Sequence, residues 1–105
     1  MASGRLGKGA AGSGTTTNIY TAPGAIQFAT VNIIVCNTSA ATRLIRTAVA
    51  VGGVAGANDW IDYDQSLPPG GMREITAVVM SPGESVLSQA DGAGVVTRVH
   101  GHEKI

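Results

Sequence analysis

TTTNIYTAPGAIQFATVNIIVCN, residues 15–37, is the stretch that decides the fold. It begins with β-branched residues and an aromatic, a composition typical of a short strand. Pro23 and Gly24 then favour a turn. After the turn, residues 26–36 alternate between the two faces of a strand, and one face consists of Ala29, Val31, Ile33 and Val35. The stretch therefore predicts a strand, a corner and a long strand with one buried face.

Five more segments of the same kind follow, and turns of small or turn-forming residues separate them. They are residues 42–51, 59–64, 73–80, 85–89 and 95–100. Many short strands at regular spacing are typical of a sandwich or a small barrel. We therefore predict an all-β fold, a single antiparallel β-sandwich of about seven strands with an Ig-like or jelly-roll-like arrangement.

Simple alternation also predicts which side chains of two of these strands face inward. In residues 42–51 the expected inward set is Ile45, Thr47 and Val49. In DWIDYD, residues 59–64, alternation places Ile61 and Tyr63 on one face and Trp60, Asp62 and Asp64 on the other. Trp60 is thereby expected to point outward, where a tryptophan marks a contact surface for a partner.

The N-terminal segment, MASGRLGKGAAGSG, has a different composition. Residues 1–14 contain five glycines and one large aliphatic side chain, that of Leu6. Because Gly- and Ser-rich segments behave as flexible coils, we expect a flexible N-terminal arm over residues 1–14 and a β-sandwich domain over residues 15–105. An arm of this kind suits ordering on a neighbouring subunit, and its candidate partner-binding residues are Arg5, Leu6 and Lys8.

Length, charge and cysteine content limit the possible classes. A chain of 105 residues forms one domain with a single core. Seven basic and seven acidic residues cancel, so we expect no nucleic-acid partner, because such proteins normally carry a basic surface. Cys36 is the single cysteine, so the fold has no intrachain disulfide and fits a reducing cytoplasm. The sequence shows neither a signal peptide nor an apolar run of membrane-spanning length, and we expect no membrane partner.

Two groups of side chains are candidates for metal binding. Asp59, Asp62 and Asp64 lie close together in sequence, but a solvated strand face explains them better than a Ca²⁺ site with six or more oxygen ligands. His100 and His102 project to the same side of a strand, as two zinc ligands would, but no further ligand is evident. We therefore expect no metal and no cofactor, and retain these two histidines as the weak candidates.

The sequence contains none of the familiar catalytic motifs. It has no G-x-S-x-G elbow, no phosphate-binding P-loop and no G-x-G-x-x-G between a strand and a helix. The expected function is therefore non-enzymatic. Trp60 favours contact with a protein, and stacking on a sugar is the alternative use of its ring.

The order of short motifs resembles that of a group of small virion structural proteins of tailed bacteriophages. These proteins are described as capsid decoration (cement) proteins or tail-associated proteins. The resemblance covers residues 15–103 and rests on IYTAP (residues 19–23), VCN (35–37), DWIDYD (59–64) and VHGHE (99–103). The chain departs from the group in the alanine-rich residues 42–56 and in His102, where an aromatic is expected.

The resemblance implies a function and a location. It implies a decoration protein that binds the outer shell of the virion and stabilises contacts between major capsid subunits, using the N-terminal arm. The expected partners are the phage major capsid protein and neighbouring copies of the chain, as a dimer or trimer. The protein would be assembled in the bacterial cytoplasm, and we favour the capsid surface over the tail. A tail, baseplate or fibre component is the alternative, and a carbohydrate-binding module for host attachment is the alternative from another class.

Overall fold

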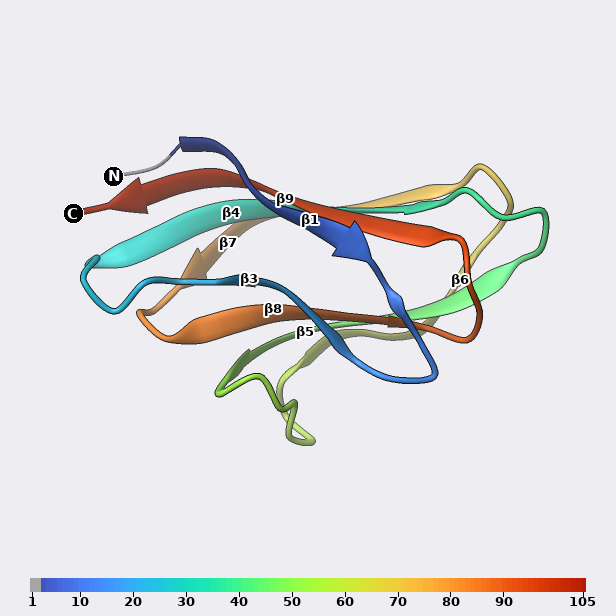
Figure 1. Cartoon of the computed structure of the whole chain (residues 1–105), viewed down its shortest axis with the longest axis horizontal. Coiled ribbons are helices and arrows are strands. Elements are labelled where there is room, and N and C mark those ends of the chain that lie inside the picture. Colours follow the sequence, from blue (N-terminus) through green and yellow to red (C-terminus); the bar gives the residue numbers. More distant parts are fainter. Residues whose placement is uncertain (1–2) are drawn as a thin grey trace.

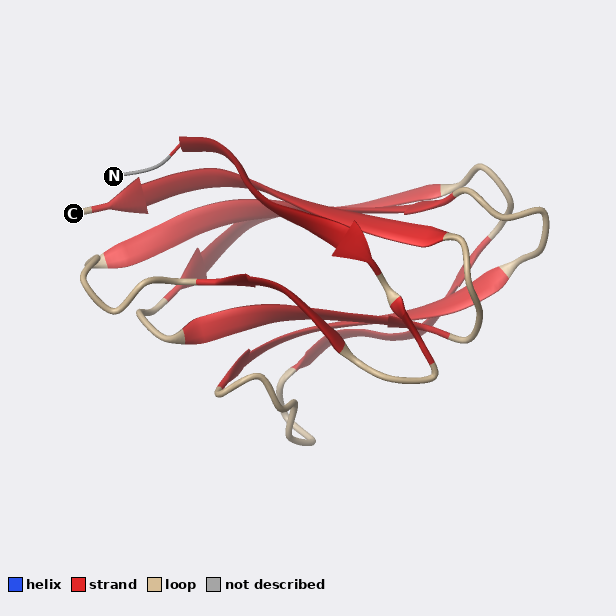
Figure 2. Cartoon of the chain, in the orientation of Figure 1, coloured by secondary structure: helices blue, strands red, loops and turns tan. Residues whose placement is uncertain are grey.

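The chain folds into two β-sheets that pack face to face (Figures 1 and 2). The structure is a computed structural model that describes residues 3–105. The predicted β-sandwich is confirmed, with nine strands in place of about seven. The strands are β1 (Ser3–Ala10), β2 (Gly12–Ser13), β3 (Thr17–Thr21), β4 (Phe28–Asn37), β5 (Arg43–Val51), β6 (Trp60–Leu67), β7 (Met72–Met80), β8 (Glu84–Ala90) and β9 (Val95–Lys104). Within this part of the chain no helix is long and apolar enough to cross a membrane.

The strands divide between the two sheets in a simple order. One sheet, called the β4 sheet, runs β1-β9-β4-β7. The other, called the β5 sheet, runs β2-β8-β5-β6, and β3 also pairs with β8. All pairings are antiparallel except the short one between β2 and β8. The start of β1 and the end of β9 lie side by side at one end of the sandwich (Figure 1), because Ser3 is opposite His102.

The core lies between the sheets where the sequence alternates most regularly. All four residues of the predicted apolar face of β4 are completely buried. Ile45 and Thr47 of β5 are buried too, and Val49 packs against the same core, as predicted. Burial of a branched aliphatic side chain stabilises a fold by roughly 1.5–3 kcal/mol, so these alternating strands supply much of the driving force.

The N-terminal segment is not the flexible coil that its composition predicts. Ser3–Ala10 forms β1 and pairs with β9, and Gly12–Ser13 forms β2 and pairs with β8. Gly7 explains why a glycine-rich strand fits here: a Cβ at this position would clash with the carbonyl oxygen of Ile19 on β3. Glycine at this position therefore permits β1 to cross close to β3, and does not make the segment flexible. The expectation of a flexible arm is wrong for these two strands, and residues 1–2 of that arm lie outside the described residues.

Bulges in β6 overturn the predicted faces of DWIDYD. Opposite Arg46 of β5, β6 carries two residues, Tyr63 and Asp64, and a second extra residue, Ile61, lies between the next two pairs. Each extra residue breaks the two-residue period, so side chains that alternation separates can share a face. Asp62 consequently points into the core, with 2% of its surface exposed, while Asp64 is exposed.

Candidate binding surfaces

The outer face of the β4 sheet gathers cationic side chains from both ends of the chain. Lys8 of β1 is directly opposite Arg98 of β9, and Arg5 is opposite His100. Opposed residues of an antiparallel pair project to the same face. A bulge at Leu6, between the Arg5 and Gly7 pairs, allows Arg5 and Lys8 to share this face although they are three positions apart. We call this surface the cationic face; it comprises Arg5, Lys8, Arg98, His100, His102 and Lys104.

The four Arg and Lys side chains of the cationic face form no ion pair within residues 3–105. The two ion pairs found there use Arg46 and Arg73, which belong to other surfaces. Most carboxylates are also occupied away from this face, each by a hydrogen bond or ion pair: Asp59, Asp62, Asp64, Glu84, Asp91 and Glu103. Glu74 of β7 is left to share the outer face of the β4 sheet. A net charge of zero therefore conceals a segregated charge distribution.

The two histidines proposed from sequence lie within the cationic face. His102 is opposite Ser3 and Thr30, and His100 is opposite Arg5 and Asn32. Among the described residues, no three His, Cys, Asp or Glu side chains are grouped closely enough to hold a metal ion. Along β9 the outward positions recur every second residue, so its four basic side chains are spaced about 7 Å apart.

A second surface lies on the outer face of the β5 sheet, around Arg46. Its guanidinium donates two hydrogen bonds to Asp64, from Nε to Oδ1 at 2.6 Å and from Nη2 to Oδ2 at 3.2 Å. The same group lies 4.0 Å from the ring centroid of Tyr63. The Tyr63 ring in turn meets Trp60 edge-on, with the centroids 5.5 Å apart and the planes at 74°. We call these four residues the Arg46 cluster.

The bulge in β6 builds the Arg46 cluster. Tyr63 and Asp64 are adjacent in sequence yet both reach Arg46, which a regular strand would prevent. Asp64 accommodates the bulge with a left-handed backbone at φ 54°. The hydrogen bonds to Asp64 raise the pKa of Arg46, and the same bonds lower the pKa of Asp64. Both groups therefore keep their charges at neutral pH.

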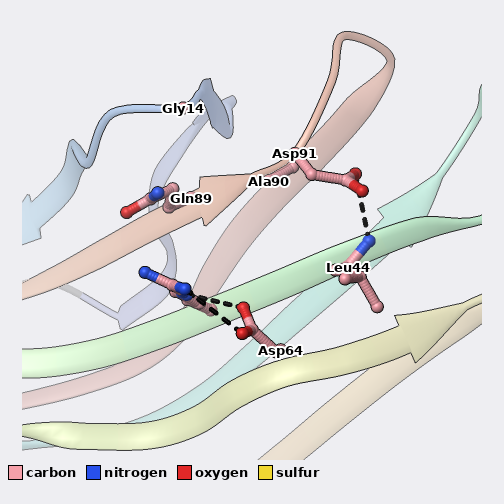
Figure 3. A pocket seen from close by; sticks show the side chains of 7 residues that line it. Gly14, Leu44, Asp64, Gln89, Ala90 and Asp91 are labelled. Atoms are coloured by element: carbon pink, nitrogen blue, oxygen red, sulfur yellow. Dashed lines mark hydrogen bonds and ion pairs between the residues drawn. The ribbon is translucent and has the colours of Figure 1, made fainter.

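A depression of about 340 Å³ lies beside the Arg46 cluster (Figure 3). Arg46 and Asp64 line it, and Gln89 and Asp91 contribute further polar groups. Asp91 Oδ1 accepts the backbone N–H of Leu44 at 3.1 Å, which holds this carboxylate at the rim. A second depression, of about 370 Å³, is lined by Ala57, Trp60 and Tyr63.

The residues proposed from sequence separate into different environments. Arg5 and Lys8 are exposed on the cationic face, whereas Leu6 is half-buried and packs against the core of its own chain. Trp60 is half-buried on the outer side of the β5 sheet, where it covers a small cluster of Ala48, Ala50 and Leu87. It contacts Tyr63, so the prediction that these two rings occupy opposite faces is wrong.

Sequence reasoning named several members of both surfaces as candidates, but it missed Arg98, Lys104 and Arg46 and did not predict which side chains lie together. The basic residues of β9 follow a visible pattern, because Arg98, His100, His102 and Lys104 occupy every second position. Nothing in the sequence marks the bulge that places Arg5 and Lys8 beside this row, or the bulge that brings Tyr63 into contact with Arg46. Comparison with protein-family models, curated proteins and solved structures found no match for this chain.

Proposed function

We propose that this protein is a non-enzymatic virion structural protein that docks its cationic face on an acidic surface of the shell. The role is that of a capsid decoration protein, which binds the major capsid protein and ties neighbouring subunits together. The observation that supports the proposal is the segregation of charge: four exposed Arg and Lys side chains on one sheet face have no ion-pair partner within residues 3–105. The resemblance in motif order to phage decoration and tail-associated proteins supports it as well.

The strand β1 takes part in this proposal as a fixed element. Arg5 and Lys8 are presented by a strand paired with β9, next to Arg98 and His100. Because the side chains are held by the sheet, less conformational entropy is lost on binding than an unstructured arm would lose. Many copies on a symmetric shell add avidity, so each single contact can be weak. Neighbouring copies, as a dimer or trimer, would complete such a lattice.

Charge reversal tests this proposal. The protein is mixed with shells assembled without it, and co-sedimentation is measured for Lys8→Glu and for Arg43→Glu as a control with the same charge change. Arg43 lies outside the cationic face, on β5, where its Nε donates to the carbonyl of Ala93. Lys8→Glu should abolish binding at moderate salt while Arg43→Glu binds normally, and added salt should weaken the wild-type complex.

The location of binding separates the alternatives. Density of the protein at the junctions of shell subunits, seen by electron cryomicroscopy of intact particles, would support the decoration role. Density on the tail, baseplate or fibres would replace it with the tail assignment. Equal sedimentation of Lys8→Glu and the wild type, or binding to naked DNA in place of the shell, would overturn the docking proposal.

A further inference from the structure

The depression beside the Arg46 cluster lies on the sheet opposite the cationic face and is not explained by docking to a shell. Its rim carries polar groups that retain unused hydrogen-bonding capacity. Arg46 uses Nε and Nη2 on Asp64, which leaves its Nη1 group to donate. Asp91 accepts one bond at Oδ1, and its second oxygen has no partner within residues 3–105. The amide of Gln89 can both donate and accept.

We propose that this depression binds a neutral pyranose unit of an oligosaccharide. Each sugar hydroxyl is both a donor and an acceptor, so a sugar needs both kinds of partner placed close together. A guanidinium, a carboxylate and an amide line this depression, and each is planar and able to span two adjacent hydroxyls. Leu44, which is 41% exposed, also lines the depression and offers an apolar surface to the C–H face of the ring.

The neighbouring aromatic depression extends the same site. Tyr63 and Trp60 both line this second depression. Arg46, which lines the first depression, lies over the Tyr63 ring and so joins the two. Aromatic rings bury the apolar faces of sugars while leaving the hydroxyls free to reach polar groups. The two depressions therefore have the chemistry for successive units of one chain, with polar recognition at Gln89 and stacking at Tyr63.

The site is built before any ligand arrives. Arg46 is held by two hydrogen bonds to Asp64 and by its contact with the Tyr63 ring, so little side-chain freedom is left to lose. Asp64 adopts a left-handed backbone that is uncommon for a residue with a side chain. Such strain occurs often at binding sites, where it fixes a required geometry.

The charge balance at the rim selects a neutral ligand. Asp64 neutralises Arg46, so the remaining charge at the rim is the carboxylate of Asp91. An acidic sugar would meet this carboxylate without a free cation nearby to offset the repulsion. The volume of about 340 Å³ lies at the lower end of the usual range of small-molecule sites, about 300–1,000 Å³, and suits one ring per depression.

The single tryptophan provides a direct test, because Trp60 is the sole source of indole fluorescence and lies in the site. The full chain is titrated with maltohexaose, cellohexaose and chitohexaose as neutral probes and with oligogalacturonate as an acidic probe. We expect a saturable change in Trp60 emission with at least one neutral probe and none with the acidic probe. A wider array of neutral oligosaccharides extends the same measurement.

Matched variants tie such binding to the rim. Gln89→Ala removes a side chain that has no hydrogen-bonding role in the fold within residues 3–105, and should weaken binding about tenfold. Asp91→Asn keeps an acceptor for Leu44 and should weaken binding as well. Lys8→Ala, on the opposite sheet, should leave binding unchanged. Absence of binding to every neutral oligosaccharide, or equal affinity of Gln89→Ala and the wild type, would overturn the proposal.

Discussion

Tyr20 donates a hydrogen bond to Oε2 of Glu103 at 2.6 Å and thereby links the two sheets of the sandwich. Tyr20 belongs to β3 and Glu103 to β9, 83 positions later in the chain. Both residues are buried, at 8% exposure each. Arg73 and Asp62 form a comparable link between β7 and β6, with Nη2 to Oδ1 at 2.8 Å. Polar contacts thus connect the two sheets in addition to the apolar core between them.

Tyr20→Phe should destabilise the protein by about 1–3 kcal/mol, because the buried carboxylate of Glu103 loses its donor. Burial and the hydrogen bond to Glu103 raise the pKa of Tyr20 above its ordinary value of 10.0. The stabilisation from this group is therefore fully present below pH 10 and is lost as the pH rises beyond it. Urea unfolding at neutral and alkaline pH measures both effects. Tyr63→Phe, an exposed tyrosine of β6, is the control and should unfold like the wild type.

Thr47→Val should stabilise the protein by about 1 kcal/mol. The hydroxyl of Thr47 is completely buried and has no hydrogen-bond partner within residues 3–105, so its desolvation is uncompensated. Thr97→Val is the matched control, because its hydroxyl lies 2.7 Å from that of Ser88 and shares a buried hydrogen bond with it. The control should lose stability. Denaturant midpoints measure the difference, and a destabilised Thr47→Val would contradict the prediction.

Gly7→Ala should detach β1 from the sandwich. The added methyl group would clash with the carbonyl of Ile19 and crowd the Cβ of Tyr20, at 3.1 Å. Hydrogen exchange should then show loss of amide protection across Ser3–Ala10. If β1 instead shifts but stays paired with the sheet, the protein should be destabilised by about 1–3 kcal/mol. Gly24→Ala is the control, since its Cβ would meet nothing within 4 Å. Full protection of β1 in Gly7→Ala would show that the close crossing is not a constraint.

The strands that sequence predicts well are those whose apolar residues alternate without interruption. In β4, the alternating apolar residues from Ala29 to Val35 correctly predict the buried face, because the local sequence pattern alone determines which face is apolar. The strand β1 was not predictable in this way, since Gly7 and Gly9 permit a close contact with β3 that exists only in the folded chain. Composition alone cannot distinguish a glycine needed for close approach from one in a flexible coil.

The two candidate surfaces were harder to predict than the fold, because each depends on a bulge in one strand. A bulge changes the face of every later residue in its strand, but it is fixed by pairing with a distant strand. The bulge at Leu6 depends on pairing with β9, and the bulge at Tyr63 and Asp64 depends on pairing with β5. Single residues such as Trp60 could be identified as candidates, whereas their neighbours across the sheet could not.

Asp64→Asn tests the ion pair that closes the β6 bulge. Hydrogen bonding to Arg46 lowers the pKa of Asp64 below its ordinary value of 3.8. A carboxylate whose pKa is lowered by folding stabilises the fold above its unfolded-state pKa, and this contribution is lost as the pH falls through the lowered value. Asparagine tolerates the left-handed backbone as aspartate does, so the substitution changes the charge and leaves the turn geometry intact.

The wild type should therefore be more stable than Asp64→Asn at pH 7, and the difference should shrink as the pH is lowered towards about 2. Added salt should also reduce the difference at pH 7, since the Asp64 side chain is 44% exposed and open to screening. Urea midpoints of both proteins at the two pH values measure this directly. A gap of the same size at both pH values would mean that Asp64 acts through its shape in the bulge and that its charge contributes nothing.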